Sequence, residues 1–107
     1  MKNEIVRFVA PLQAVSIEEG YDPIHFLTPP AEAAEAIAGH ELARRLEFGK
    51  PRGFRSVKVA ARIGASEWST SAFRNKDGSW FLPVKKPVRL AEGLAEGDAV
   101  EIELELL

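Results

Sequence analysis

The chain contains no cysteine among its 107 residues and only two histidines. The lack of cysteine excludes disulfides, thiolate catalysis and cysteine-based zinc sites, and it is typical of a reducing compartment such as the cytoplasm, where we expect the protein to reside. The two histidines, His25 and His40, are 15 residues apart and have no Glu or Cys at metal-ligand spacing. We therefore predict neither a metal site nor a bound cofactor.

Long apolar runs are also missing. No segment approaches the roughly 20 consecutive apolar residues that a membrane-spanning helix needs. Near the N-terminus Glu4 and Arg7 interrupt the apolar residues, so the pattern differs from that of a signal peptide. A chain of this length suits one domain, and we predict a single soluble domain over residues 1–107 with no membrane partner.

A strong excess of either charge is absent from the chain as a whole, whose formal net charge is −2. The charges are nevertheless segregated. Residues 50–89 carry ten Lys or Arg and two acidic residues, while the rest of the chain carries four basic and fourteen acidic residues. Such segregation indicates either a basic face for an anionic partner or pairing between oppositely charged strands within the fold.

Two segments alternate between apolar and charged positions, which is typical of half-buried strands. In residues 100–106 the polar positions are glutamates, and in residues 56–63 the polar positions include Lys58 and Arg62. If the two strands are neighbours in one sheet, their opposite charges face each other and contribute about a few tenths of a kcal/mol per pair. Much of the polarity would then belong to a solvated ladder of paired side chains.

Four further strands are expected, and the last two form a hairpin because Asp77-Gly78 is a strong two-residue turn signal. Large aromatic side chains flank this hairpin. They fit the interior of a small barrel, with a stacking platform for bases or another ligand as the alternative. These aromatic residues are Trp68, Phe73, Trp80 and Phe81. The four strands are expected at residues 4–15, 24–28, 66–74 and 79–84.

Two helices are expected between the strands. The first begins at a Pro-Pro pair, has acidic residues early and arginines late as the helix dipole favours, and contains Gly39, a residue at which it can divide. The second is short, with Pro87 near its first turn and Gly93 placed to end it in a left-handed conformation. The following Leu94 is expected to pack back onto the barrel.

A weak internal repeat relates the two helices. FLTPPAEAAEAIAG at 26–39 and FLPVKKPVRLAEG at 81–93 share an aromatic-Leu strand end, proline, a helical stretch and glycine. The repeat predicts two strand-helix halves, about residues 4–48 and 54–107, wrapped around a pseudo-two-fold axis. The predicted fold is mainly β with two helices, a barrel capped by a helix at each end with no sheet edge left wide open.

Three successive motifs in the second half carry a resemblance to a known family. They are IGASEWSTSAF in residues 63–73, LPVKKPVRLAEG in residues 82–93, and GLAEGDAVEIE in residues 93–103. The chain resembles the bacterial family described as domain of unknown function 1905, whose members carry an IGG-x-x-W-x-TSLFP-like strand pair, a Y-x-LPVKKAVRKA-like helix and a GL-x-x-GD-x-V-x-V strand.

The resemblance is weaker elsewhere. In the first half only Phe8, Ala10 and Leu12 match the family's opening F-x-A-x-L pattern. Arg74 stands where the family often has Pro, and Pro87 stands where it often has a small or polar residue. These departures weaken the transfer of a ligand site more than the transfer of a fold.

The resemblance implies a double-split β-barrel, similar in shape to the swapped-hairpin barrels of the AbrB and MazE regulators and antitoxins. Their IP-x-x-VR-x-x-LG-x-x-x-GD-x-VE pattern is similar to the C-terminal segment of this chain. It implies that Pro83, Gly93, Gly97 and Asp98 form a structural motif, in which Gly-Asp turns the chain into the last strand. The family implies no activity.

The function that we expect is that of a non-enzymatic binding or interaction module for a small anion, a peptide or another protein. Lys85 and Arg89 are four residues apart, so on a helix they share one face and could clamp a carboxylate or phosphate, with Lys86 and Arg74 nearby. Alternatively, these side chains are solvated and their stems cover the barrel mouth. The candidate ligand-binding residues are Trp68, Ser71, Arg74, Lys85, Lys86 and Arg89.

Two other function classes stay open. DNA binding follows from the similarity to AbrB, but a sequence pI of 5.7 is unfavourable for phosphate contacts. The regulators also bind as dimers, whereas this chain is predicted to contain both halves. An enzyme is the second alternative, although the hydroxyls around Trp68 have no assigned base and GLAEGD lacks the Lys-Ser/Thr of a P-loop. We predict no catalytic residue, and either a monomer or a homodimer.

Overall fold

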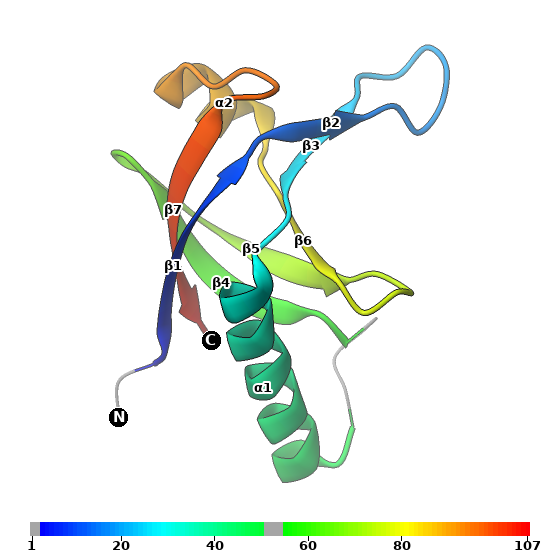
Figure 1. Ribbon diagram of the computed structural model, residues 1–107, viewed down its shortest axis with the longest axis vertical. Coiled ribbons are helices and arrows are strands. Elements are labelled where there is room, and N and C mark those ends of the chain that lie inside the picture. The colour runs from blue at the N-terminus through cyan, green and yellow to red at the C-terminus, as the bar shows by residue number, and fades with distance from the viewer. Residues whose placement is uncertain (1–2, 51–54) are drawn as a thin grey trace.

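The computed structural model describes residues 3–50 and 55–107, which form a curled β-sheet with two helices (Figure 1). Arg52, one of the basic residues counted above, and the start of the second predicted half lie outside the described residues. The helices are α1 (Ala31–Phe48) and α2 (Lys86–Glu92). The strands are β1 (Ile5–Pro11), β2 (Gln13–Val15), β3 (Ile24–Leu27), β4 (Val57–Ile63), β5 (Ser66–Arg74), β6 (Trp80–Pro83) and β7 (Ala99–Leu106).

The seven strands form one antiparallel sheet in the order β1-β7-β4-β5-β6-β3-β2. The two edge strands are consecutive in the chain, so the sheet curls until its first and last strands meet at Leu12. The Leu12 N–H donates to the Asp98 carbonyl and its carbonyl accepts from the Gly97 N–H, both at 2.8 Å. The chain therefore follows β7 up to Leu12 and then leaves it for β3. The single strand predicted at residues 4–15 was wrong, because this bend divides it.

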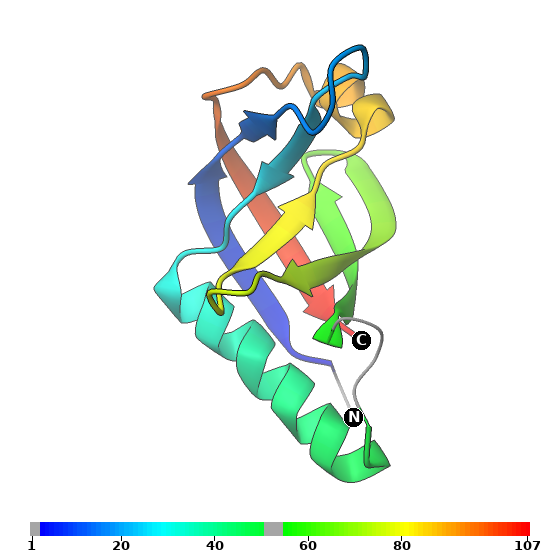
Figure 2. The ribbon, with the colours of Figure 1, turned by 90° about the vertical axis from the view of Figure 1, so that its right-hand side faces the viewer.

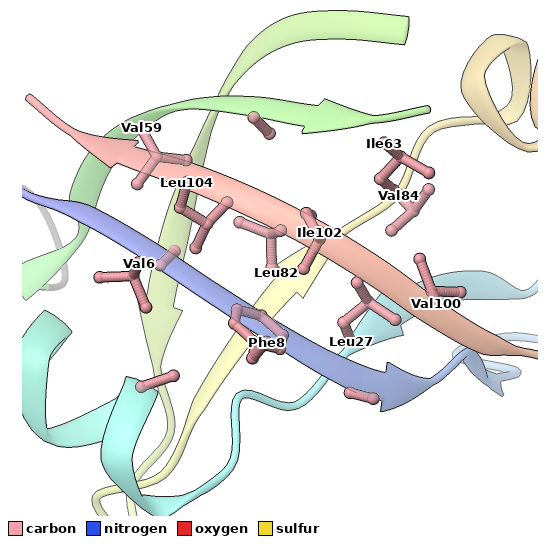
Figure 3. Packing of buried hydrophobic residues seen from close by; sticks show 14 of the residues in the cluster. Val6, Phe8, Leu27, Val59, Ile63, Leu82, Val84, Val100, Ile102 and Leu104 are labelled. Atoms are coloured by element: carbon pink, nitrogen blue, oxygen red, sulfur yellow. The ribbon is translucent and has the colours of Figure 1, made fainter. Parts of the chain in front are cut away.

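The core lies inside the curl and is built from alternate positions of the strands. β7 and β4 bury every second residue, as the alternation of apolar and charged residues predicted. Figure 3 shows side chains from opposite parts of the curl meeting, including Leu104 of β7, Leu82 of β6 and Leu27 of β3. These three leucines are fully buried. The mainly β fold with two helices is thereby confirmed.

The two helices lie at opposite ends of the barrel, with α1 across one end and α2 at the other (Figures 1 and 2). Gly39 does not divide α1, which is continuous over 18 residues. Gly39 is exposed and the space around it is open, so its lack of a side chain disturbs no packing. α1 ends at Gly49, which has a φ of 78°, and α2 ends at Gly93, which has a φ of 64°. The end predicted for α2 is confirmed, and Leu94 packs against the core.

The two halves of the chain share a local order of elements. β3 leads through proline into α1 and a left-handed glycine, and β6 leads through proline into α2 and another left-handed glycine. The pseudo-two-fold repeat itself stays a prediction. Among the described residues, no helix is long and apolar enough to cross a membrane.

Candidate functional site

One half of the barrel's outer surface carries a row of alternating charges, made of Arg7, Glu103, Arg62 and Glu67 on four neighbouring strands. Glu103 lies in the middle. Its Oε1 accepts from Nε and Nη2 of Arg7, both at 2.8 Å, and its Oε2 accepts from Nη2 of Arg62 at 3.0 Å. The predicted pairing of β4 with β7 is confirmed. We call these four residues the charged row.

The charged row borders a shallow hollow of about 380 Å³ on the outer sheet. The floor includes Ala60 and Ser69, whose small side chains leave space between larger neighbours. Glu105, which also lines the hollow, accepts a hydrogen bond from the side-chain amide of Asn3 at 3.2 Å. Three carboxylates and one guanidinium line this hollow, so its charge does not favour an anionic ligand.

The basic residues predicted to clamp an anion lie at α2 in a different arrangement from the one expected. Lys85 is the N-cap of α2, with an extended backbone (ψ 155°), so it precedes the helix. Lys86 begins the helix and is exposed. The Nε of Arg89 donates to the backbone carbonyl of Val84 at 3.2 Å, which turns this guanidinium back toward the start of the helix.

The other predicted ligand residues lie on β5. Arg74 is at the far end of β5, where its Nη2 lies 3.6 Å from the position that a Cβ would take on Gly78. Trp68 is buried in the core, and Ser71 is half-buried opposite Lys58. The structure thus brings Lys85, Lys86 and Arg89 to one helix, and the other three residues are distributed along β5. A ligand-binding role for all six stays a prediction.

The residues of the predicted structural motif form turns at the end of the barrel that holds α2. Pro83 pairs with Phe26 across β6 and β3. Gly97 has a φ of 92°, and the side-chain Oδ2 of Asp98 accepts from the Ala95 N–H at 2.8 Å, which closes the turn into β7.

The second half of the outer surface is apolar and hollowed. A groove of about 240 Å³ runs over β2, β3 and β6 to the turn between β5 and β6. Phe26 and Phe81 meet edge-on with ring centroids 6.1 Å apart, and Phe81 stacks on Phe73 at 5.5 Å. We call this the apolar groove, and its lining residues are Val15, Ile17, Ile24, Phe26, Asn75 and Phe81.

The position of the aromatic residues corrects the prediction that all four fill the core. Trp68 and Trp80 are buried. Phe73 and Phe81 are only half-buried, because they pair across β5 and β6 on the side of the sheet opposite to their buried neighbours. They extend the apolar surface of the groove outside the barrel.

The groove residues of β2 and β3 were not predicted as site residues from the sequence. A signal was present in IHFL, residues 24–27, and WFLP, residues 80–83, which lack the charged residues that alternate in β4 and β7. Strands whose two faces are both apolar are typical of burial on both sides. Here one of the two faces is left open to solvent.

The polar groups suited to catalysis or metal binding are dispersed. Within the described ranges, no group of three or more His, Asp or Glu side chains could hold a metal ion. His40 makes a 2.9 Å hydrogen bond from its Nε2 to the backbone carbonyl of Leu107. His25 Nδ1 is buried and has no hydrogen-bond partner among the described residues.

The curled antiparallel sheet, its two end helices and the open apolar groove define a small barrel protein with a hollowed outer face. The comparison with protein families shows that the chain belongs to the family described as domain of unknown function (DUF1905), whose model matches residues 8–104. The match extends well into the first half, beyond the motifs that carried the resemblance. A search of curated proteins found no match.

Proposed function

We propose that the protein is a non-enzymatic interaction module that binds a segment of a partner protein in the apolar groove. The observation that carries this proposal is the composition of the groove, in which five of six lining side chains are apolar. Three of them keep a large share of their surface in water, with Val15 46%, Ile17 72% and Ile24 42% exposed. Contiguous exposed apolar surface of this kind marks interaction sites on otherwise polar proteins.

The energetic argument follows from area. Removing a half-exposed Val or Ile side chain from water contributes about 1 kcal/mol, so several such side chains in one groove support a specific complex. The aromatic pair Phe26 and Phe81 adds rigid surface that loses little side-chain entropy on binding. A partner side chain that enters the groove therefore gains contact at low cost.

The basic residues support an anion site or a DNA surface less well. Arg62 is already paired with Glu103, and the Nε of Arg89 is bonded to a backbone carbonyl. Arg74 is the last residue of β5, next to the hairpin turn. DNA binding depends on many phosphate contacts from one positive face, and the outer surface of β4 is instead interleaved with glutamates of β7.

The proposal is tested by selecting binders from a library of random twelve-residue peptides displayed on phage. Wild-type protein should enrich a set of apolar peptides, and Ile17→Asn with Ile24→Asn should abolish that enrichment. Leu46→Asn is the matched control, because Leu46 is 74% exposed on α1 and Ile17 is 72% exposed in the groove. Peptides that bind the wild type and the groove variant equally well would refute the proposal.

A further inference from the structure

Two lysines lie at the ends of β6, beside the apolar groove. Lys76 is in the turn before β6 and is adjacent in the chain to Asn75, which lines the groove. Lys85 follows β6. The Val84 N–H donates to the His25 carbonyl at 2.9 Å, so the β3–β6 register continues past Pro83 and brings Lys85 alongside Ile24. Both lysines are exposed.

Neither lysine is neutralised by the protein. In residues 3–50 and 55–107, ion pairs involve Arg7, Arg45 and Arg62, and none involves Lys76 or Lys85. This differs from the charged row, where each arginine faces a carboxylate across the strands. An unpaired positive charge next to an apolar surface is available for a negatively charged group on a ligand.

The acidic residues near the groove lie in the loop that leads into Ile24, at the same end of β3 as Lys85. Glu18, Glu19 and Asp22 are exposed in the loop between β2 and β3, next in the chain to groove residues Ile17 and Ile24 or close to them. These carboxylates repel an acidic ligand from the loop, whereas Lys85, across from Ile24, attracts it toward β6.

A fourth carboxylate, that of Asp77, lies in the same turn as Lys76 but is already engaged. It accepts from the Ser79 hydroxyl at 2.6 Å and from the Ser79 N–H at 2.9 Å. It also lies near the guanidinium of Arg74, whose charge helps to lower its pKa. Asp77 therefore stays ionised, and together with Arg74 and Lys76 it gives the turn a formal net charge of +1.

The shape of the groove favours an extended ligand. Its floor is made of strands, and its volume of about 240 Å³ accommodates side chains rather than a helix, whose diameter is about 10–12 Å. Successive residues of a strand rise about 3.3 Å, so Ser79, the neighbour of Asn75 across the turn, and Lys85 are separated by roughly 20 Å. An extended peptide covers that distance in about six residues.

We infer that the partner segment is an extended peptide whose apolar side chains alternate and are flanked at each end by an acidic residue, one recognised by Lys76 and the other by Lys85. This inference rests on the proposed function and specifies the ligand of the same groove. The apolar side chains supply contact area, and the two carboxylates fix the position of the peptide along β6.

The experiment compares the peptides selected by three forms of the intact protein from the same random library. The first is the wild type, the second carries Lys76→Glu with Lys85→Glu, and the third carries Lys50→Glu with Lys58→Glu. The third is a matched control, because it changes the net charge equally at exposed lysines outside the groove lining. Fluorescence anisotropy then measures the affinity of one selected peptide for each form.

Wild type and control should enrich peptides with acidic residues about six positions apart, and the Lys76→Glu, Lys85→Glu variant should instead enrich Lys or Arg at those positions. Each lysine should contribute about a two- to fivefold difference in Kd, and the difference should shrink as salt is raised. Peptides without charge preference that are still lost in Ile17→Asn with Ile24→Asn would overturn this inference and leave the proposed function standing. No groove-dependent enrichment in any form would overturn both.

Discussion

The two halves of the barrel's outer surface present different kinds of side chain to solvent. Over β1, β7 and β4 the outward positions carry charges that pair across strands, with Glu103 between two arginines. Over β6, β3 and β2 the outward positions carry Phe81, Phe26 and Val15, and within residues 3–50 and 55–107 Lys76 and Lys85 beside them form no ion pair. Both halves face the same apolar interior.

This difference separates the outer side chains whose interactions are made within the folded chain from those that are available to a ligand. The basic side chains of the charged row form ion pairs with Glu103 of the same chain, so they need no partner molecule. The apolar groove exposes surface that folding alone would favour burying, and natural monomers seldom keep such surface without a use. Four predictions test the comparison.

The largest expected effect is on the core that both halves share. Leu104→Ala beneath the charged half and Leu82→Ala beneath the groove should each lower the free energy of unfolding by about 2–5 kcal/mol, because both leucines are fully buried. Urea denaturation measures this. A loss at only one of the two positions would show that the halves do not share one cooperative core.

The next effect concerns the β4–β5 turn on the charged side. Gly64 has a φ of 57°, and a Cβ there would collide with the carboxylate of Glu92, which accepts a 2.7 Å bond from Ser66. Gly64→Ala should cost about 1–3 kcal/mol of stability, from backbone strain and from displacement of Glu92.

Gly93→Ala is the matched control for this turn, because Gly93 has a φ of 64° but open space around it. It should cost only the strain, about 1 kcal/mol. Thermal denaturation measures the loss of stability in both variants. The double variant Gly64→Ala with Glu92→Ala should recover the extra loss that Gly64→Ala shows over Gly93→Ala. Equal losses for the two single variants would show that displacing Glu92 costs no stability.

A smaller effect is expected in the charged row. Glu103→Gln leaves Arg7 and Arg62 without their shared carboxylate and should cost about 1 kcal/mol at low salt, less as salt is raised. Glu101→Gln is the control, because Glu101 pairs with Val9 rather than with a basic residue. Urea denaturation at two salt concentrations measures both. A salt-independent effect at Glu103 would mean that the row is held by packing instead of charge.

The smallest effect is at the turn beside the groove. The hydrogen bonds from Ser79 hold the pKa of Asp77 below its usual value of 3.8. A depressed carboxyl pKa stabilises the fold above the unfolded value and loses that contribution as pH falls below it. NMR titration should show the Asp77 pKa rising in Ser79→Ala, with Asp98 as the internal reference. An unchanged Asp77 pKa would mean that Ser79 does not order the turn.

The sequence specified the fold well where its pattern had one interpretation. In β7 the alternation of apolar residues with glutamates predicted both the buried face and the charge of the outer face, and the structure shows the oppositely charged β4 as its neighbour. Gly93 likewise marked the end of α2 because its left-handed conformation is one that glycine favours.

The groove was not predicted because β3 and β6 carry no charged residue that marks their outer face. In IHFL and WFLP a period of two gives no choice between inward and outward side chains. Only the pairing of Phe26 with Pro83 and of Phe73 with Phe81 shows which side chains point outward. Lys85 is the N-cap of α2 and its carbonyl accepts from the Arg89 N–H at 3.1 Å, and the clamp expected from these two residues stays a prediction.

The most direct test is an NMR titration of the isotopically labelled protein with the tightest-binding selected peptide. The account predicts that amide shifts change at the groove, at Val15, Ile17, Ile24 and Phe81, and that Arg7 and Glu103 of the charged row stay unchanged. Shifts concentrated on the charged row or on α2, with the groove unaffected, would contradict it.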